Sequence, residues 1–289
     1  MYFLENEELK IAIHPHGAEL QSIYHKQHSL EYMWEGNPSF WAKRSPVLFP
    51  VVGALKEDSY NFENTAYHLP RHGFARNMEF KVEEHSTDFI SFALESSPET
   101  LLLFPFHFKF YIDYRVINNK LQVTYRVENK GNNDLYFSVG GHPAFKIPLA
   151  EGTSYEDYAI SFEREETLYR WPVTKEGLIG SSPVLLLEKG GPLPLSKALF
   201  KDDALVLKNL QSGSLTLRSD KTPHGLLFDF SEFPYLGVWA APGADFVCIE
   251  PWCGIADSVH ASGQLVQKEG INKIEPSGLF RRTWTASFF

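Results

Sequence analysis

The chain has 289 residues, and its 27 Lys and Arg against 36 Asp and Glu give a formal charge of −9 at pH 7. This acidic balance argues against non-specific nucleic-acid binding, which requires a broad basic face to neutralise phosphates. Aromatic residues make up 15% of the chain, enough to fill a core, so the composition excludes a disordered polymer. No apolar run reaches the roughly 18 residues of a membrane-spanning helix.

The two cysteines, Cys248 and Cys253, are too few for a disulfide framework or a complete zinc site. The first ten residues show neither the basic nor the apolar region of a secretion signal. We therefore expect a soluble, cytoplasmic protein with no membrane or nucleic-acid partner. Because no linker-like segment divides the chain, we predict a single domain over 1–289, with the Pro- and Gly-rich residues 181–195 as a surface excursion.

Alternating apolar residues predict β-strands along most of the chain. Residues 110–116 and 121–127 place an apolar side chain at every second position, and Asn118-Asn119 between them predicts a tight hairpin turn. Similar short runs predict strands at 80–82, 89–94, 135–139, 205–207, 215–217, 226–230 and 246–249. Residues 196–200 and 257–259 are each expected to form a helical turn or two.

Many short strands with sparse helix indicate an all-β sandwich or barrel. Some of the runs alternate between apolar and polar residues, and others are apolar on both faces. This mixture favours a two-layer β-sandwich with little helix.

Three polar sites lie within apolar or glycine-rich segments, where a titratable group is costly unless it is used or paired. In residues 70–76, PRHGFAR, His72 lies between Arg71 and Arg76, an arrangement that suits an oxygen-rich or anionic ligand. The alternative is a solvated basic loop. In residues 138–145, SVGGHPAF, two glycines and a proline fix an irregular backbone that can project His142 into a cleft, unless this histidine is structural.

The third site is Glu250, which follows the apolar residues 246–249 and precedes Pro251 and Trp252. We expect Pro251 to end the strand, so that Glu250 lies at its tip. Burial there raises the pKa of a carboxyl towards the range that suits a general base. A buried glutamate paired with an arginine for structure is the alternative. The sequence contains no nucleotide-binding loop, serine-hydrolase elbow or zinc-protease motif.

Together these segments resemble the aldose 1-epimerase (galactose mutarotase) superfamily. The matching residues are HGFAR at 72–76, GGHPAF at 140–145 and IEPW at 249–252, in the order typical of that family, and residues 11–23 resemble its first hairpin. The resemblance spans essentially the whole chain. It implies a large antiparallel β-sandwich of the galactose mutarotase-like fold.

The resemblance also implies roles for individual residues. Glu250 matches the catalytic base, His142 the catalytic acid and His72 the histidine that orients the sugar. Asp203 is our choice for the carboxylate that binds sugar hydroxyls, with Asp202 as the alternative. Arg44 matches a substrate-side arginine of the family. Apart from the resemblance, three aromatic residues are candidates for the apolar wall under the sugar, with ordinary core packing as the alternative for each: Trp239, Trp252 and Phe74.

The chain departs from the galactose-specific pattern at residues 44–50, where RSPVLFP replaces an Asn-Arg-Ile motif. This segment resembles the branch that contains hexose-6-phosphate mutarotases and the lactose-operon X proteins. Arg44, Arg71 and Arg76 suit a phosphate because guanidinium groups match its geometry. The expected ligand is therefore a small-molecule sugar or sugar phosphate.

The expected reaction is interconversion of the α and β anomers of an aldohexose or its 6-phosphate. A carboxylate takes the C1 hydroxyl proton while an imidazole protonates the ring oxygen, and no metal or other cofactor is required. The alternative is a non-catalytic sugar-binding or sensing protein that uses the same cleft. A glycosidase fits less well, since it needs two facing carboxylates. The sequence gives no oligomeric state.

Overall fold

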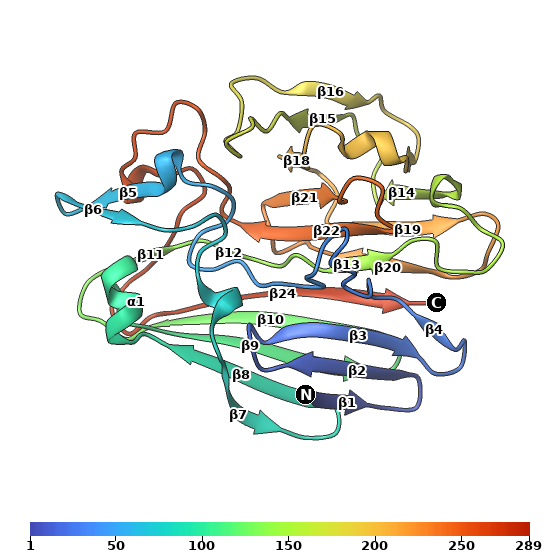
Figure 1. Ribbon diagram of the computed structural model, residues 1–289, viewed down its shortest axis with the longest axis horizontal. Helices are drawn as coiled ribbons and strands as arrows, with labels where there is room; N and C mark the ends of the chain where they lie inside the picture. The colour runs from blue at the N-terminus through green and yellow to red at the C-terminus, as the bar shows by residue number, and fades with distance from the viewer.

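Two large antiparallel sheets organise the computed structural model, which describes all residues 1–289 (Figure 1). The larger sheet has nine strands that cross the lower half of the molecule in Figure 1 and continue behind its upper half. In spatial order they are β17 (Leu193–Pro194), β14 (Tyr158–Phe162), β19 (Ser214–Ser219), β20 (Gly225–Asp229), β24 (Leu279–Phe288), β10 (Lys120–Asn129), β9 (Phe108–Ile117), β8 (Phe89–Glu95) and β7 (Lys81–His85).

The second large sheet carries seven strands, and a four-stranded sheet is built from the N-terminal residues. The seven strands are β12 (Val139–Gly140), β22 (Phe246–Cys253), β21 (Tyr235–Trp239), β18 (Leu205–Lys208), β15 (Leu168–Trp171) and β16 (Val184–Leu187), with β13 (Ala144–Lys146) also paired to β22. The four are β1 (Tyr2–Glu5), β2 (Leu9–His14), β3 (Glu19–His25) and β4 (Leu30–Glu31). Two small sheets join β5 (Ser59–Phe62) to β6 (Thr65–His68) and β11 (Leu135–Phe137) to β23 (Asn272–Ile274).

The hairpin predicted at Asn118-Asn119 is confirmed. Ile117 of β9 pairs with Lys120 of β10, so the two asparagines form the turn, and Asn118 takes a left-handed φ of 51° that asparagine tolerates well. On β10, Leu121 and every second residue after it to Val127 are buried, as the alternation predicts.

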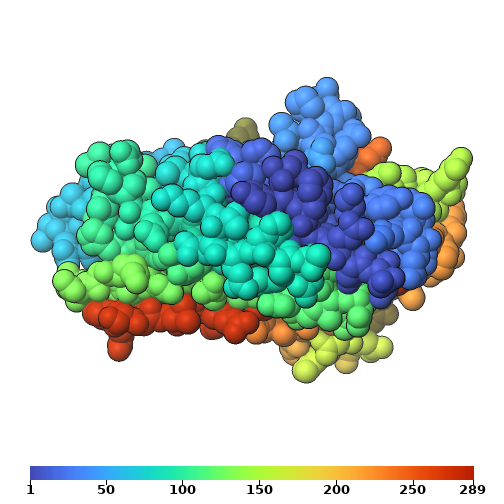
Figure 2. All heavy atoms as spheres, turned by 90° about the horizontal axis from the view of Figure 1, so that it is seen from below, coloured from blue at the N-terminus to red at the C-terminus, as the bar shows by residue number.

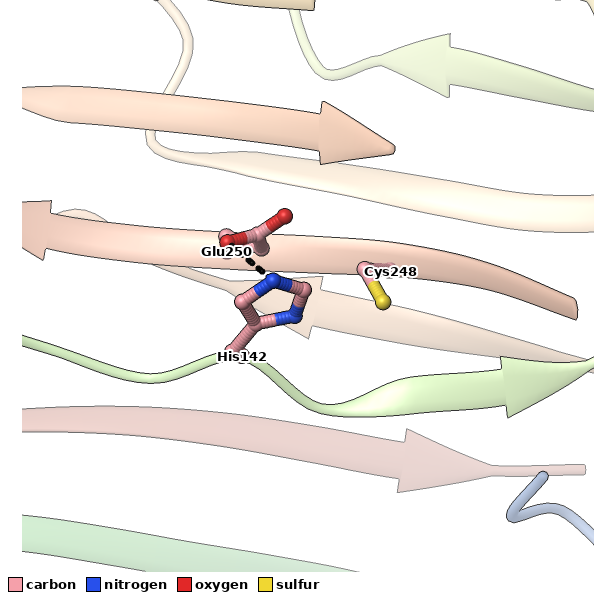
Figure 3. A group of neighbouring side chains, drawn as sticks. All are labelled: His142, Cys248 and Glu250. Atoms are coloured by element: carbon pink, nitrogen blue, oxygen red, sulfur yellow. Dashed lines mark ion pairs between the residues drawn. The ribbon is translucent and has the colours of Figure 1, made fainter. Parts of the chain in front are cut away.

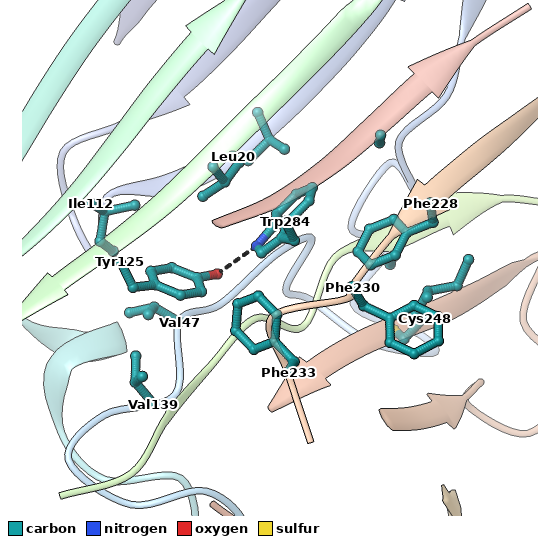
Figure 4. Close-up of a cluster of buried hydrophobic side chains, with 14 of the residues drawn as sticks. Leu20, Val47, Ile112, Tyr125, Val139, Phe228, Phe230, Phe233, Cys248 and Trp284 are labelled. Carbon is teal, nitrogen blue, oxygen red and sulfur yellow. Dashed lines mark hydrogen bonds between the residues drawn. The ribbon is translucent and has the colours of Figure 1, made fainter. Parts of the chain in front are cut away.

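The sheets pack face to face over one cluster of 69 buried apolar residues (Figure 4). Trp284 of β24 donates its indole N–H to the Tyr125 hydroxyl at 3.0 Å and stacks on Phe228. Phe228 in turn lies 5.9 Å, centroid to centroid, from Phe145 of the seven-stranded sheet. The predicted antiparallel β-sandwich is therefore confirmed. The single domain remains a prediction, which is favoured by the large core that the two sheets share.

The four-stranded sheet covers part of the nine-stranded sheet. Tyr114 of β9 donates its hydroxyl proton to the carbonyl oxygen of Ala18, and Tyr2 of β1 contacts Phe92 of β8. Figure 2 shows the molecule from below. Three parts of the chain share this face: the N-terminal residues, residues near 80–115 and the C-terminal strand.

Helix is sparse, as predicted, but it is not placed entirely where the sequence indicates. Residues 196–200 do form a helical turn, whereas 257–259 make only a bridge and a turn. Helix α1 (Pro98–Leu103) was not predicted, although Ser97 and Thr100 cap its N-terminus reciprocally. The 3-10 turns are η1 (Lys56–Asp58), η2 (Ala75–Asn77), η3 (Tyr155–Asp157), η4 (Lys197–Phe200) and η5 (Leu265–Gln267). None of the helices is long and apolar enough to cross a membrane.

Strand β22 is longer than the sequence predicts. Pro251 does not end it, and Glu250 therefore lies within the strand rather than at its tip. The carbonyl oxygen of Pro251 accepts a hydrogen bond from Gly141, in the segment between β12 and β13 where the neighbouring strand is interrupted. The missing N–H of the proline faces the same interrupted segment, so the strand tolerates it. The predicted strand over 135–139 is likewise split into β11 and β12, and the excursion at 181–195 contains the short strands β16 and β17.

Candidate active site

A cavity of about 310 Å³ opens on one face of the seven-stranded sheet. Cross-strand partners Val206, Gly237 and Glu250 share this face, while Leu205 and Ile249, which point the other way, belong to the main core. Eight residues predicted from the sequence line the cavity: Arg71, His72, Arg76, His142, Asp203, Trp239, Glu250 and Trp252.

Glu250 and His142 form a buried pair at the base of the cavity (Figure 3). The Glu250 Oε2 and His142 Nε2 atoms lie 3.3 Å apart, and Glu250 is only 1% exposed. Burial raises the pKa of the Glu250 carboxyl well above its usual value, against the opposing effect of Arg71. Burial also lowers the pKa of His142, to about 3. Because the charged form of each group is disfavoured, the pair favours sharing one proton over carrying two opposite charges.

The two glycines of the 140–145 motif make room for neighbouring side chains. A Cβ on Gly140 would lie 2.6 Å from the Trp252 ring, and one on Gly141 would lie 2.6 Å from the Tyr125 hydroxyl. The backbone of the His142 segment therefore lies directly against the core, which fixes the position of the imidazole. The indole of Trp41 stacks on that imidazole at 4.9 Å.

His72 presents one defined ring nitrogen for binding. Its Nδ1 accepts a hydrogen bond from the backbone N–H of Gly53 at 3.1 Å, which places the ring proton of the neutral imidazole on Nε2. Burial lowers the pKa of His72 well below its usual value, so the ring is neutral at pH 7. His72 also has a left-handed φ of 70°, a strained conformation of the kind that clusters at functional sites.

Arg71, Arg76 and Asp203 add charge to the cavity. Arg71 lies 3.6 Å from the Asp203 carboxylate, and its backbone carbonyl oxygen accepts a hydrogen bond from the Arg76 guanidinium. Burial and the adjacent Arg71 lower the pKa of Arg76. Asp203, like His72, has a left-handed backbone, with φ of 82°. The alternative candidate, Asp202, instead faces Arg170 on the surface and does not line the cavity.

Indole rings supply the apolar walls. Trp239 and Trp252 line the cavity as predicted, and the Trp252 indole N–H is buried without a hydrogen-bond acceptor. An unpartnered donor in a cavity is a binding group for a ligand oxygen, since leaving it unpaired costs free energy. Trp41 completes the wall and was missed, because it lies in a loop with no strand pattern or motif around it.

Two predicted residues lie elsewhere. Phe74 packs in the core against Phe49 and Phe108 rather than lining the cavity. Arg44 turns to the N-terminal sheet, where its guanidinium donates to the carbonyl oxygen of Gln21 at 2.6 Å. The sequence also gave no sign of the loop after β15, which brings Val173, Gly177 and Ile179 to the cavity.

Known proteins resemble this chain along most of its length. The family model described as aldose 1-epimerase matches residues 1–270. The chain belongs to the aldose 1-epimerase family. It is 32% identical over 292 aligned residues to the chromosomal protein LacX of Lactococcus lactis subsp. lactis, with 97% of each chain covered.

Solved structures of this family share the fold. A galactose mutarotase related enzyme from Lactobacillus acidophilus superposes with a TM-score of 0.95 at 36% identity, covering 100% of this chain and 97% of that one. A galactose mutarotase-like protein from Lactobacillus casei gives 0.94 at 29% identity, with both chains fully covered. These similarities confirm the sandwich predicted for an aldose 1-epimerase family member.

Proposed function

We propose that this protein is an aldose 1-epimerase that interconverts the α and β anomers of an aldohexose or hexose 6-phosphate. The observation that carries the proposal is the buried Glu250–His142 pair, 3.3 Å apart, at the base of an indole-walled cavity. Indole faces and a few convergent polar groups suit a pyranose ring.

Ring opening needs one group that accepts a proton and one that donates a proton. In the reacting state the shared proton lies on His142, and hydrogen bonds from the bound sugar compensate for the charges that burial disfavours. The Glu250 carboxylate then takes the proton of the C1 hydroxyl, while His142 gives its proton to the ring oxygen. Because the pair holds one proton in a site shielded from water, it supplies one base and one acid without a further cofactor. After rotation about C1–C2, the aldehyde closes from its other face with the two roles exchanged.

The other polar groups position the sugar. The His72 Nε2–H and the Trp252 indole N–H donate hydrogen bonds to sugar oxygens, and the Asp203 carboxylate accepts from hydroxyl groups. Arg71 and Arg76 favour an anionic group, because a phosphate relieves the repulsion between two neighbouring guanidinium groups. This supports a hexose 6-phosphate as the preferred substrate.

Exchange NMR between anomers tests the reaction, using glucose, galactose and their 6-phosphates. Glu250→Gln and His142→Gln are each expected to lower kcat by about 10²- to 10⁴-fold. His25→Gln, at a buried histidine remote from the cavity, is the matched control and is expected to keep the wild-type rate. Saturable sugar binding with no acceleration of exchange by the wild-type protein would instead identify a non-catalytic sugar-binding protein.

Arg71→Met and Arg76→Met test the phosphate preference. Each is expected to reduce kcat/KM for the 6-phosphates by about tenfold more than for the free sugars, given the strength of hydrogen bonds between charged partners. Equal losses for both sugar classes would contradict phosphate recognition and leave the epimerase proposal intact.

A further inference from the structure

Three side chains that can bind a metal ion meet beside the cavity. His142, Cys248 and Glu250 are all buried, and one donor atom from each lies within 4.8 Å of the other two. Cys248 and Glu250 are two residues apart on β22 and therefore project from the same face of the strand. Figure 3 shows the His142 ring with one nitrogen directed at Glu250 and the other on the side of Cys248.

The donor set matches the chemistry of zinc. One imidazole nitrogen, one thiolate sulfur and one carboxylate oxygen are the ligand types that Zn²⁺ takes, at about 2.0–2.3 Å in a tetrahedron. Such bond lengths place neighbouring ligand atoms about 3.3–3.8 Å apart. The His142–Glu250 contact of 3.3 Å already has that length. The two pairs that include the Cys248 sulfur are at most 4.8 Å apart and must shorten by up to about 1.3 Å.

The proposed epimerase reaction leaves part of this cluster unused. Cys248 is a free thiol with no exposed surface, and the proton transfers at C1 and the ring oxygen do not involve it. A cation held between His142 Nε2 and Glu250 would take this thiol as its third ligand.

We propose that His142, Cys248 and Glu250 form an inhibitory site for a zinc-like divalent cation, with its fourth coordination position open to the cavity. The cation enters through the cavity, which His142 and Glu250 line. Binding displaces the Cys248 thiol proton and the proton shared by Glu250 and His142, and both protons pass to solvent. The inhibitory part of this inference rests on the proposed epimerase function, because the cation occupies both the acid and the base; the binding part does not.

Titration with Cd²⁺ alone tests binding independently of catalysis. A thiolate–cadmium charge-transfer absorption band in the ultraviolet is expected to saturate at one equivalent in the wild-type protein. Cys248→Ala and the closer isostere Cys248→Ser are expected to abolish the band, with thermal unfolding used to verify that each variant is folded. Cys253→Ala removes the other buried free cysteine and is expected to keep the band.

Exchange NMR in the presence of Zn²⁺ tests the inhibition. Wild type and Cys253→Ala are expected to lose activity when Zn²⁺ is added and to regain it with EDTA. Cys248→Ser is expected to keep its basal rate without Zn²⁺ and to require at least tenfold more Zn²⁺ for the same inhibition. Mg²⁺ is expected to have no effect, since it prefers oxygen ligands. A band that persists in both Cys248 variants, or no saturable Cd²⁺ binding at all, would overturn the site. If the wild-type protein shows no exchange activity, the proposed function fails and the cadmium band still decides the metal site.

Discussion

The Trp252 indole lies against a glycine on each neighbouring strand, so alanine at either glycine forces the ring to move. A Cβ on Gly237 would lie 2.4 Å from the indole, and a Cβ on Gly140 would lie 2.6 Å from it. Carbon atoms in van der Waals contact are normally about 3.5–4.0 Å apart, so relief requires a shift of about 1 Å or more. The free space next to the ring is the cavity that Trp252 lines, so we expect the ring to shift into it.

The expected loss of stability for Gly237→Ala or Gly140→Ala is about 1–3 kcal/mol, the usual effect of overpacking. For a chain of this size that corresponds to a fall in Tm of about 2–4 °C per kcal/mol. The same shift narrows the cavity, so KM for the sugar is expected to rise together with the loss of stability. Gly191→Ala is the matched control, because nothing lies within 4 Å of its Cβ position.

A double-mutant cycle isolates the clash. Trp252→Leu removes the ring that the new methyl group meets, so Gly237→Ala is expected to be less destabilising in that background by about 1 kcal/mol or more. Thermal and urea unfolding of the four proteins measure this coupling. An equal effect of Gly237→Ala in both backgrounds, or an effect no larger than that of Gly191→Ala, would refute the reasoning.

Three further predictions concern the stability of the fold. Lys268→Met should destabilise the protein by about 3–5 kcal/mol in urea unfolding, since the buried Asp257 carboxylate loses its cation and keeps only the backbone N–H of Lys56. The double variant Lys268→Met/Asp257→Leu should recover part of that loss, because it removes the uncompensated charge but also the acceptor of the Lys56 N–H. Tyr125→Phe should reduce the unfolding free energy by about 1 kcal/mol, because Trp284 loses its hydrogen-bond acceptor; a neutral result would contradict this. Burial lowers the pKa of His25 below 6.5, so at acid pH the folded state binds fewer protons at this residue than the unfolded state does. The free energy of unfolding should therefore fall as the pH drops below 6.5, by at most about 1.4 kcal/mol per pH unit for this group. The same pH series on His25→Gln should show a shallower slope, and an unchanged slope would exclude this contribution.

The strands could be predicted where one face alone is buried, as on β10, because the period of two appears directly in the residue types. Strand β22 is buried along its whole length, so no alternation of residue types marks its end. The prediction relied on Pro251 instead and ended the strand too early. A proline ends a strand only if its missing N–H would have been bonded by a neighbour. Whether the neighbouring strand is continuous at that point is a property of the sheet and not of the residues around the proline.

The sequence by itself determined which residue types are available for chemistry: a glutamate in an apolar strand, a histidine after two glycines and a histidine between arginines. Only the tertiary structure decided which of them meet. The register of β12, β13 and β22 brings His142 to Glu250, and a left-handed backbone aligns His72 and Asp203 with the same cavity. Arg44 and Phe74 carry suitable side chains but point away from the cavity, while Trp41 enters it from a loop that no sequence motif marks. Long-range packing decides the position of all three side chains, and local sequence spacing does not encode that packing.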